Sequence, residues 1–189
     1  MKQTVLSSII TRQRRREQDR RELIAVAGPA LSASKRVIFK LQRQDVAGAA
    51  AELEAAQRQF AIGFRLCRRD AALLDQGVWR AAQDEYSEAL FMYDFIVHGS
   101  IGVSKAITDD PEILIGGLSD FTGELARYAV IKATEGEHEM VERFYCMAEK
   151  VVASLLSLDL TGSLRAKFDQ AKQHLRKLED IRYDLSKRA

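Results

Sequence analysis

The chain contains little of what stabilises or interrupts many other kinds of protein. Only two of its 189 residues are cysteines, two are prolines, and 7% are aromatic. Because Cys67 and Cys146 lie far apart and no signal-peptide pattern is present, we expect reduced thiols in a cytoplasmic protein. No apolar run approaches the roughly 20 residues of a membrane-spanning helix, so a membrane protein is not expected. The net charge of +2 shows no excess of either sign, so affinity for a polyanion would have to come from local patches.

The composition that is present favours helices. Hydrophobic residues make up 47% of the chain, and the good helix formers alanine, leucine, arginine and glutamate are common. Apolar side chains recur at helical spacing in residues 2–44, 45–75, 79–97, 111–133, 137–157 and 163–186. Asp45 is placed to cap the second segment, and the Gly28-Pro29 pair should kink or break the first. We therefore predict an all-α protein, a single elongated helical domain of about six to seven helices over residues 1–189.

Three glycines lie inside the apolar helix predicted over residues 111–133. Pro111 suits its first turn, whereas Gly116, Gly117 and Gly123 each cost a helix about 1 kcal/mol relative to alanine. Glycines retained at this cost indicate that another backbone or a ligand comes close to the helix there.

Four carboxylates on two of the predicted helices could form one site. Asp120 and Glu124 lie four residues apart, in line with Arg127, and Glu85 and Glu88 lie three apart on a face that becomes apolar within two turns. Carboxylates that enter a buried face need a cation, a proton or a partner. If the two helices pack together, the four acids would offer the oxygen ligands that Mg²⁺ or Mn²⁺ prefers. The alternative is a set of surface acids in local ion pairs, with Arg127 beside Glu124.

Arginines are clustered in two places. One cluster lies in the TRQRRREQDRRE stretch, the other near the end of the second predicted helix, and a further arginine follows the tryptophan of VWR. These clusters either contact nucleic-acid phosphates or form solvated faces with local ion pairs. The candidate phosphate contacts are Arg14, Arg15, Arg68, Arg69 and Arg80.

Other kinds of site have no signal in the sequence. His98, His138 and His174 lack the neighbouring ligands of a zinc site, so we expect surface or capping histidines. No Walker-type loop, GxGxxG or GxSxG motif is present. Trp79 is expected to anchor a core or an interface.

Several segments together resemble the translin family, and they are most similar to its nuclease branch, translin-associated factor X. These segments are QDEYSEALFMYDFI, GGLSDFTGELARYAV and LRAKFDQAKQHLRKLEDIRYDLSKRA, with EQDRREL and VWR earlier in the chain. The most specific part is EYxEA followed by GxxDxTGELxR, because generic amphipathic helices have no reason to carry both. One departure is ALLDQGV, where translin has a basic and aromatic run.

The resemblance implies an all-helical subunit in a closed shell of roughly eight copies. It also implies binding of single-stranded RNA or DNA, and metal-dependent ribonuclease activity in the translin-associated factor X branch. The acids of that branch match Glu85, Glu88 and Asp120, with Glu124 next on the same face. The translin branch has non-acidic residues in place of Glu85 and Glu88.

Our expectation from the sequence is therefore a Mg²⁺- or Mn²⁺-dependent endoribonuclease. It would act on single-stranded RNA, with single-stranded DNA as a further ligand, inside a homo-octamer. Glu85, Glu88, Asp120 and Glu124 would hold the ion and serve catalysis. Two alternatives stay open: a translin-type protein that binds single strands without cutting them, and a plain helical scaffold.

Overall fold

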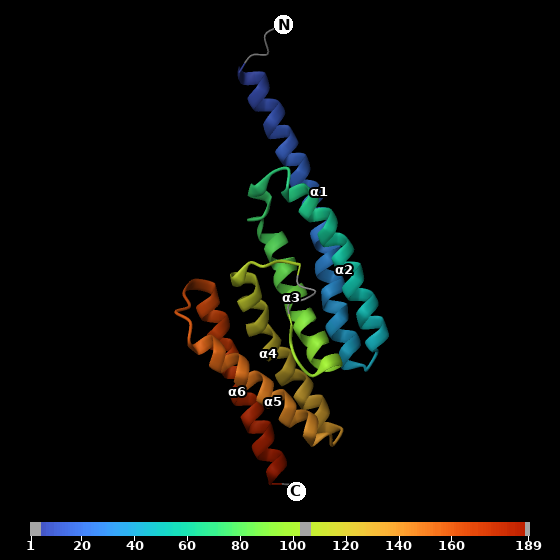
Figure 1. Cartoon of the computed structure of the whole chain (residues 1–189), viewed down its shortest axis with the longest axis vertical. Helices are drawn as coiled ribbons and strands as arrows, with labels where there is room; N and C mark the ends of the chain where they lie inside the picture. The colour runs from blue at the N-terminus through green and yellow to red at the C-terminus, as the bar shows by residue number, and fades with distance from the viewer. Residues whose placement is uncertain (1–4, 103–106, 188–189) are drawn as a thin grey trace.

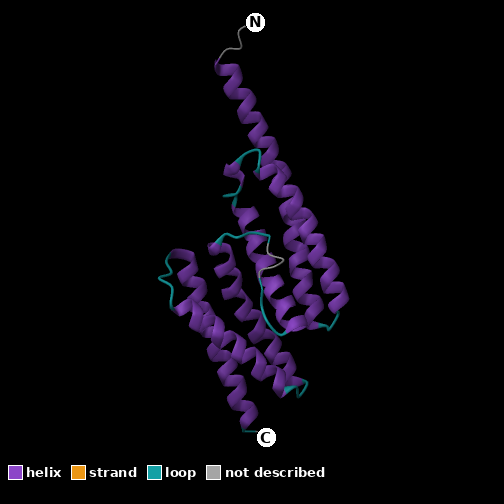
Figure 2. Ribbon diagram, viewed as in Figure 1, coloured by secondary structure: helices purple, strands orange, loops and turns teal. Residues whose placement is uncertain are grey.

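The structure is a computed structural model that describes residues 5–102 and 107–187. In these residues the chain forms six α-helices, one short 3₁₀ helix and no strand, which confirms the all-α prediction (Figure 2). The elements are α1 (Val5–Gln42), α2 (Val46–Cys67), η1 (Ala71–Leu73), α3 (Gly77–His98), α4 (Pro111–Thr134), α5 (His138–Leu156) and α6 (Gly162–Ser186). Residues 2–4 of the first predicted helix lie outside the described part of the chain. None of the described helices is both long and apolar enough to cross a membrane.

The helices pack side by side into an elongated molecule (Figure 1). α1 packs against α2 and α3, α3 packs against α4, and α4 carries α5 and α6 on its other side. The beginning of α1 projects beyond the remaining helices. α4 therefore occupies the middle of the arrangement, between α3 and the pair formed by α5 and α6.

Of the two predicted effects of Gly28-Pro29, a break does not occur, because α1 continues through Pro29; a kink stays a prediction. Proline removes one backbone hydrogen bond from a helix interior, at a cost of about 3 kcal/mol. Ala27 and Ala30, on either side of the pair, are completely buried in the core. Packing of this alanine-rich face against the neighbouring helices holds the helix together across the proline.

The boundaries of the helices follow local capping chemistry. As predicted, Asp45 caps α2 by accepting a hydrogen bond from Gly48 N at 2.8 Å. Asp110 caps α4 in the same way, and Pro111 occupies its first turn. The second predicted segment was too long, since α2 ends at Cys67 and residues 71–73 form the 3₁₀ helix.

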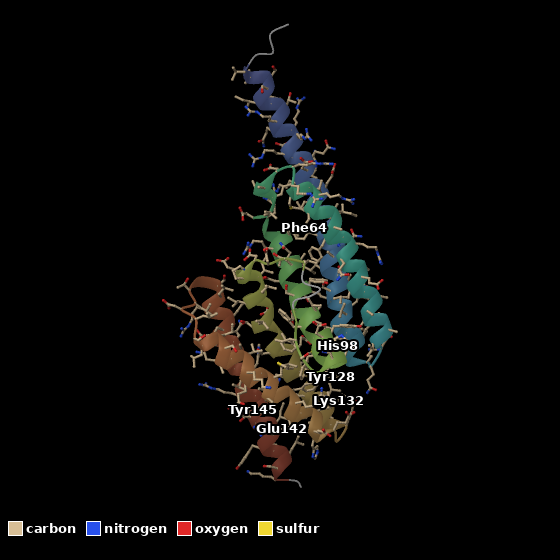
Figure 3. The ribbon with its side chains drawn as sticks, viewed as in Figure 1. Phe64, His98, Tyr128, Lys132, Glu142 and Tyr145 are labelled. Carbon is tan, nitrogen blue, oxygen red and sulfur yellow. The ribbon has the colours of Figure 1, made fainter. Side chains whose placement is uncertain are left out.

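An aromatic cluster fills the core between α2 and α3. Trp79 is fully buried, as expected for a core anchor, and its ring centroid lies 5.1 Å from that of Phe60 and 5.1 Å from that of Phe64, which is labelled in Figure 3. Gly63 lies against the Trp79 ring, where a Cβ atom would collide with it. The cluster holds the beginning of α3, and the carboxylates of α3 follow from the second turn of that helix onward.

Candidate functional site

α3 comes very close to α4 at Gly117. A Cβ atom on Gly117 would lie 2.6 Å from Ser87 Cβ and 3.1 Å from Glu88 N. The sequence prediction that a backbone comes close to this helix is therefore confirmed at this glycine. The consequence is that the turn of α3 carrying Glu85 and Glu88 lies directly against α4.

The other two glycines make room for side chains of α6. A Cβ atom on Gly116 would lie 3.1 Å from Lys167 Nζ, and one on Gly123 would lie 2.9 Å from His174 Cε1. The glycines of α4 therefore allow α3 to pack closely against it and leave space for two polar side chains of α6.

The four predicted acids influence one another electrostatically. The pKa of Glu88 is raised to about 9. Burial is the largest cause, and the negative charges of Glu85, Glu124 and Asp120 add to it. Burial also raises the pKa of Glu85, as do Asp120 and Glu124, while Lys35 opposes the shift. Asp120 and Glu124 on α4 are therefore close enough to act on Glu85 and Glu88 of α3, so the four acids share one partly buried region between the two helices.

Asp120 is held by a lysine of α6. Lys167 Nζ lies 2.9 Å from Asp120 Oδ2 and 3.0 Å from Asp84 Oδ2, so one ammonium group joins α3, α4 and α6. Burial raises the pKa of Asp84, although Lys167 opposes the effect. Burial lowers the pKa of Lys167, but its hydrogen bonds to the two aspartates outweigh this and the pKa lies above its usual value.

Glu124 and Glu85 each have partners on α1 or α4. Glu124 accepts a hydrogen bond from Gln42 Nε2 of α1 at 2.8 Å and lies 3.3 Å from Arg127 Nη1. Glu85 lies 3.8 Å from Lys35 Nζ. An open pocket of about 400 Å³ lies between these groups, so basic side chains of α1 and α4 border the acids.

Two of the candidate arginines, one on α1 and one in the turn after α2, meet at one pocket. Arg15 and Arg69 lie 4.0 and 3.7 Å from the buried Asp19, and both line a pocket of about 500 Å³. Arg14 is exposed on the same projecting part of α1, where Figure 3 shows nitrogen-tipped side chains standing clear of the other helices. Arg68 is exposed at the C-cap of α2 and lines a different pocket.

Arg80 has a different environment from the other arginines. Its guanidinium lies 3.1 Å from Asp110 and 3.1 Å from Glu112, at the beginning of α4. One third of its side chain is exposed, at 33%. Arg80 thus joins α3 to α4 as well as facing solvent.

Comparison with known proteins agrees with this architecture. Residues 18–189 match the Translin family. The chain belongs to the translin family. No curated protein sequence matches it.

Three solved structures share the translin-family fold of this chain. The crystal structure of apo-NeC3PO aligns with a TM-score of 0.86 and 20% identity, over 95% of this chain and 96% of that one. A complex of AfC3PO with duplex RNA aligns at 0.84 and 22%, and AfC3PO alone at 0.84 and 23%, each over 96% of both chains. At these identities the likeness shows the fold.

The acids of this translin-family chain fit a divalent ion by the chemistry of their donors. Carboxylate oxygens are the ligands that Mg²⁺ and Mn²⁺ prefer. Glu88 has three acidic neighbours, and among the described side chains it makes none of the hydrogen bonds or ion pairs that hold the other three. In the part of the chain that is described, no three His, Cys, Asp or Glu side chains are grouped closely enough to hold a metal as they stand. Binding an ion therefore requires Asp120 or Glu124 to leave its present partner.

Three residues beside the acids were missed or misjudged from the sequence. The expectation of a surface or capping histidine is wrong for His174, which is partly buried with Nδ1 3.0 Å from Thr122 Oγ1. Asp84 directly precedes Glu85 but has no motif of its own, and nothing in its surroundings marks Lys167. The only local hint is Gly123, whose missing side chain leaves space for the His174 ring.

The tight contact at Gly117 can be tested by adding one methyl group. Gly117→Ala is expected to lower the free energy of unfolding by about 1–3 kcal/mol, because its Cβ would push α3 away from α4. Gly28→Ala is the matched control, since a Cβ there meets nothing within 4 Å and should stabilise α1 by about 0.5–1 kcal/mol. Urea unfolding measures both. Stabilisation by both substitutions would contradict the close approach.

Proposed function

We propose that this translin-family protein is a metal-dependent endoribonuclease of the translin-associated factor X type. It would act on single-stranded RNA, and single-stranded DNA would be a further ligand. The observation that supports this most strongly is Glu88, a partly buried acid whose pKa is raised to about 9 by burial and by three neighbouring carboxylates. A divalent cation is the partner that such an arrangement lacks.

In this proposal Glu85 and Glu88 from α3 and Asp120 and Glu124 from α4 hold Mg²⁺ or Mn²⁺. The chemistry that a divalent ion supplies in such a site is activation of a water and neutralisation of charge on a phosphate. Lys35, Arg36 and Arg127 line the adjoining pocket, where their positive charge would draw a phosphodiester toward the acids.

RNA is proposed as the substrate on two grounds. AfC3PO, which has the same fold, forms a complex with duplex RNA. Exposed and partly exposed arginines of this chain offer phosphate contacts away from the acids. We propose Arg14, Arg15, Arg68, Arg69 and the partly exposed Arg80 for that role.

We also propose that the chain, as a single domain over residues 1–189, assembles into a cytoplasmic homo-octamer. Apolar residues on the projecting part of α1 are exposed, with Val5 at 77%, Leu6 at 67% and Ile9 at 49%. Exposed apolar side chains grouped in this way favour association with another chain. Mass measurement of the purified protein in solution tests the copy number.

The decisive experiment is cleavage of labelled single-stranded RNA by the wild-type chain, Glu85→Ala and Asp120→Ala in Mn²⁺ or Mg²⁺. We expect cleavage by the wild type, loss of it in a chelator, and rates at least about 100-fold lower in both variants. Mutants that cut as fast as the wild type would show that the four-acid site is wrong. Single-stranded DNA, run in parallel, tests the second ligand.

A second candidate function is binding of single strands without cleavage. The present ion pairs of Asp120 and Glu124 favour it, since they leave neither acid free for a metal. If all three proteins bind RNA in a salt-dependent manner and none cuts it, this second function is the correct one.

A further inference from the structure

We propose that Lys167 is a resident cation of the carboxylate site that competes with the divalent ion for Asp120. The proposal rests on the metal site put forward above and adds a residue that regulates its occupancy. Lys167 acts here as a positioning residue, because its effect passes through the aspartate that it holds.

The position of Lys167 suits this role. It lies in the second turn of α6, reaches across α4 in the space left by Gly116, and places Nζ 2.9 Å from Asp120 Oδ2. Its side chain is 25% exposed, so the ammonium group is partly shielded from water while bound to two carboxylates. A charge-assisted contact of this length at a partly buried site is stronger than one on the open surface.

A divalent ion and the ammonium group compete for the negative charge of Asp120. Lys167 holds Oδ2, and two cations placed at one carboxylate repel each other. Metal binding by Asp120 is therefore weakened as long as Lys167 keeps this contact. The fraction of molecules in which Asp120 is free then limits the apparent affinity for the ion.

Asp84 provides the place to which Lys167 withdraws. Its Oδ2 already lies 3.0 Å from Lys167 Nζ, so the lysine keeps one carboxylate partner when Asp120 turns to the metal. The ammonium group is never left buried without a counter-charge, which makes the exchange feasible. Asp84 thus promotes metal binding without being a ligand.

Mn²⁺ titration of the metal-free full chain by calorimetry tests the competition. Lys167→Met is expected to bind Mn²⁺ about tenfold more tightly than the wild type. Lys167→Arg keeps the positive charge and should bind much as the wild type does. Lys172→Met is the matched control on the same helix, where Lys172 pairs with Asp169 at 2.6 Å, and the affinity of this variant should not differ from that of the wild type.

A double-mutant cycle separates positioning from direct ligation. Asp84→Asn should weaken Mn²⁺ binding, because Lys167 then has only Asp120 as a partner. The double variant Asp84→Asn/Lys167→Met should bind as tightly as Lys167→Met alone. Weaker binding by the double variant would show that Asp84 is itself a ligand and would overturn the proposal.

The remaining outcomes distinguish this proposal from the metal site on which it rests. If Glu88→Gln abolishes Mn²⁺ binding but folded Lys167→Met binds no more tightly than the wild type, the competition is wrong and the metal site stands. If neither the wild type nor Lys167→Met binds Mn²⁺, both are wrong. Binding by Lys167→Met alone would support the competition in its strongest form.

Discussion

Replacing Glu88 by glutamine is expected to abolish Mn²⁺ binding and, at the same time, to stabilise the metal-free protein at alkaline pH. Glutamine has nearly the same shape, but it does not ionise and is a poor ligand for a hard cation. The loss of affinity should be at least about 100-fold. A residue whose removal stabilises the empty protein but destroys ion binding is one retained for function.

The pH dependence follows from the raised pKa of Glu88. In the unfolded chain this carboxyl loses its proton above its ordinary pKa of 4.5, whereas burial and three acidic neighbours keep it protonated in the folded protein up to about pH 9. Between these values the unfolded state gains by releasing the proton, so the wild type loses stability as the pH rises. The advantage of Glu88→Gln should therefore be absent below pH 4.5, grow up to about pH 9 and remain constant above it.

Thermal unfolding in a chelator between pH 5 and pH 10 measures this difference. Because the folded and unfolded pKa values differ by about 4.5, we expect it to reach on the order of 6 kcal/mol at the alkaline end. Each kcal/mol corresponds to roughly 2–4 °C in the midpoint for a chain of this size. Glu54→Gln is the matched control for loss of a carboxylate on an open surface, since the Glu54 side chain is 71% exposed. A midpoint difference that shrinks with rising pH would contradict the assignment of Glu88.

Replacing Trp79 by alanine is expected to cost about 3–5 kcal/mol of unfolding free energy. The indole is fully buried against Phe60 and Phe64, and Gly63 of α2 lies directly against its ring. Removing the indole would therefore leave a cavity between α2 and α3. Because Trp79 anchors the beginning of α3, the loss should also reduce the rigidity of the acids that follow on the same helix.

Chemical denaturation of Trp79→Ala beside Trp79→Phe resolves the origin of the effect. Within residues 5–102 and 107–187, Trp79 Nε1 has no hydrogen-bond partner, so phenylalanine gives up none of the described hydrogen bonds and should recover a large part of the loss through its ring. Tyr183→Ala on α6 is a control for an aromatic residue outside the core, with 59% of the side chain exposed. Equal costs for Trp79→Ala and Tyr183→Ala would contradict the anchoring role.

The helices themselves could be predicted because their signals are local. The segments expected at 111–133, 137–157 and 163–186 correspond to α4 (Pro111–Thr134), α5 (His138–Leu156) and α6 (Gly162–Ser186). Apolar spacing and caps act within one or two turns of the chain, so they can be read without knowing the fold. The absence of a break at Pro29 has the opposite cause, since packing of distant helices outweighed a local preference.

The candidate site, like the helices, could be predicted only in part from the sequence. Glu85, Glu88, Asp120 and Glu124 could be chosen from the sequence because each pair shares a helix face and a family motif. That the pairs belong to one region depends on the contact of α3 and α4 at Gly117, which spacing along one helix does not determine.

The sequence by itself therefore determined the helical class and most helix boundaries, and it allowed the four acids to be proposed, because each of these rests on residues close together in the chain. Only the tertiary structure brought Lys167 to Asp84 and Asp120, residues 83 and 47 positions away in the chain. The physical reason is that a contact between α6 and the other helices depends on how whole helices pack. The residues next to a lysine on an amphipathic helix do not indicate which side chains of other helices it will contact.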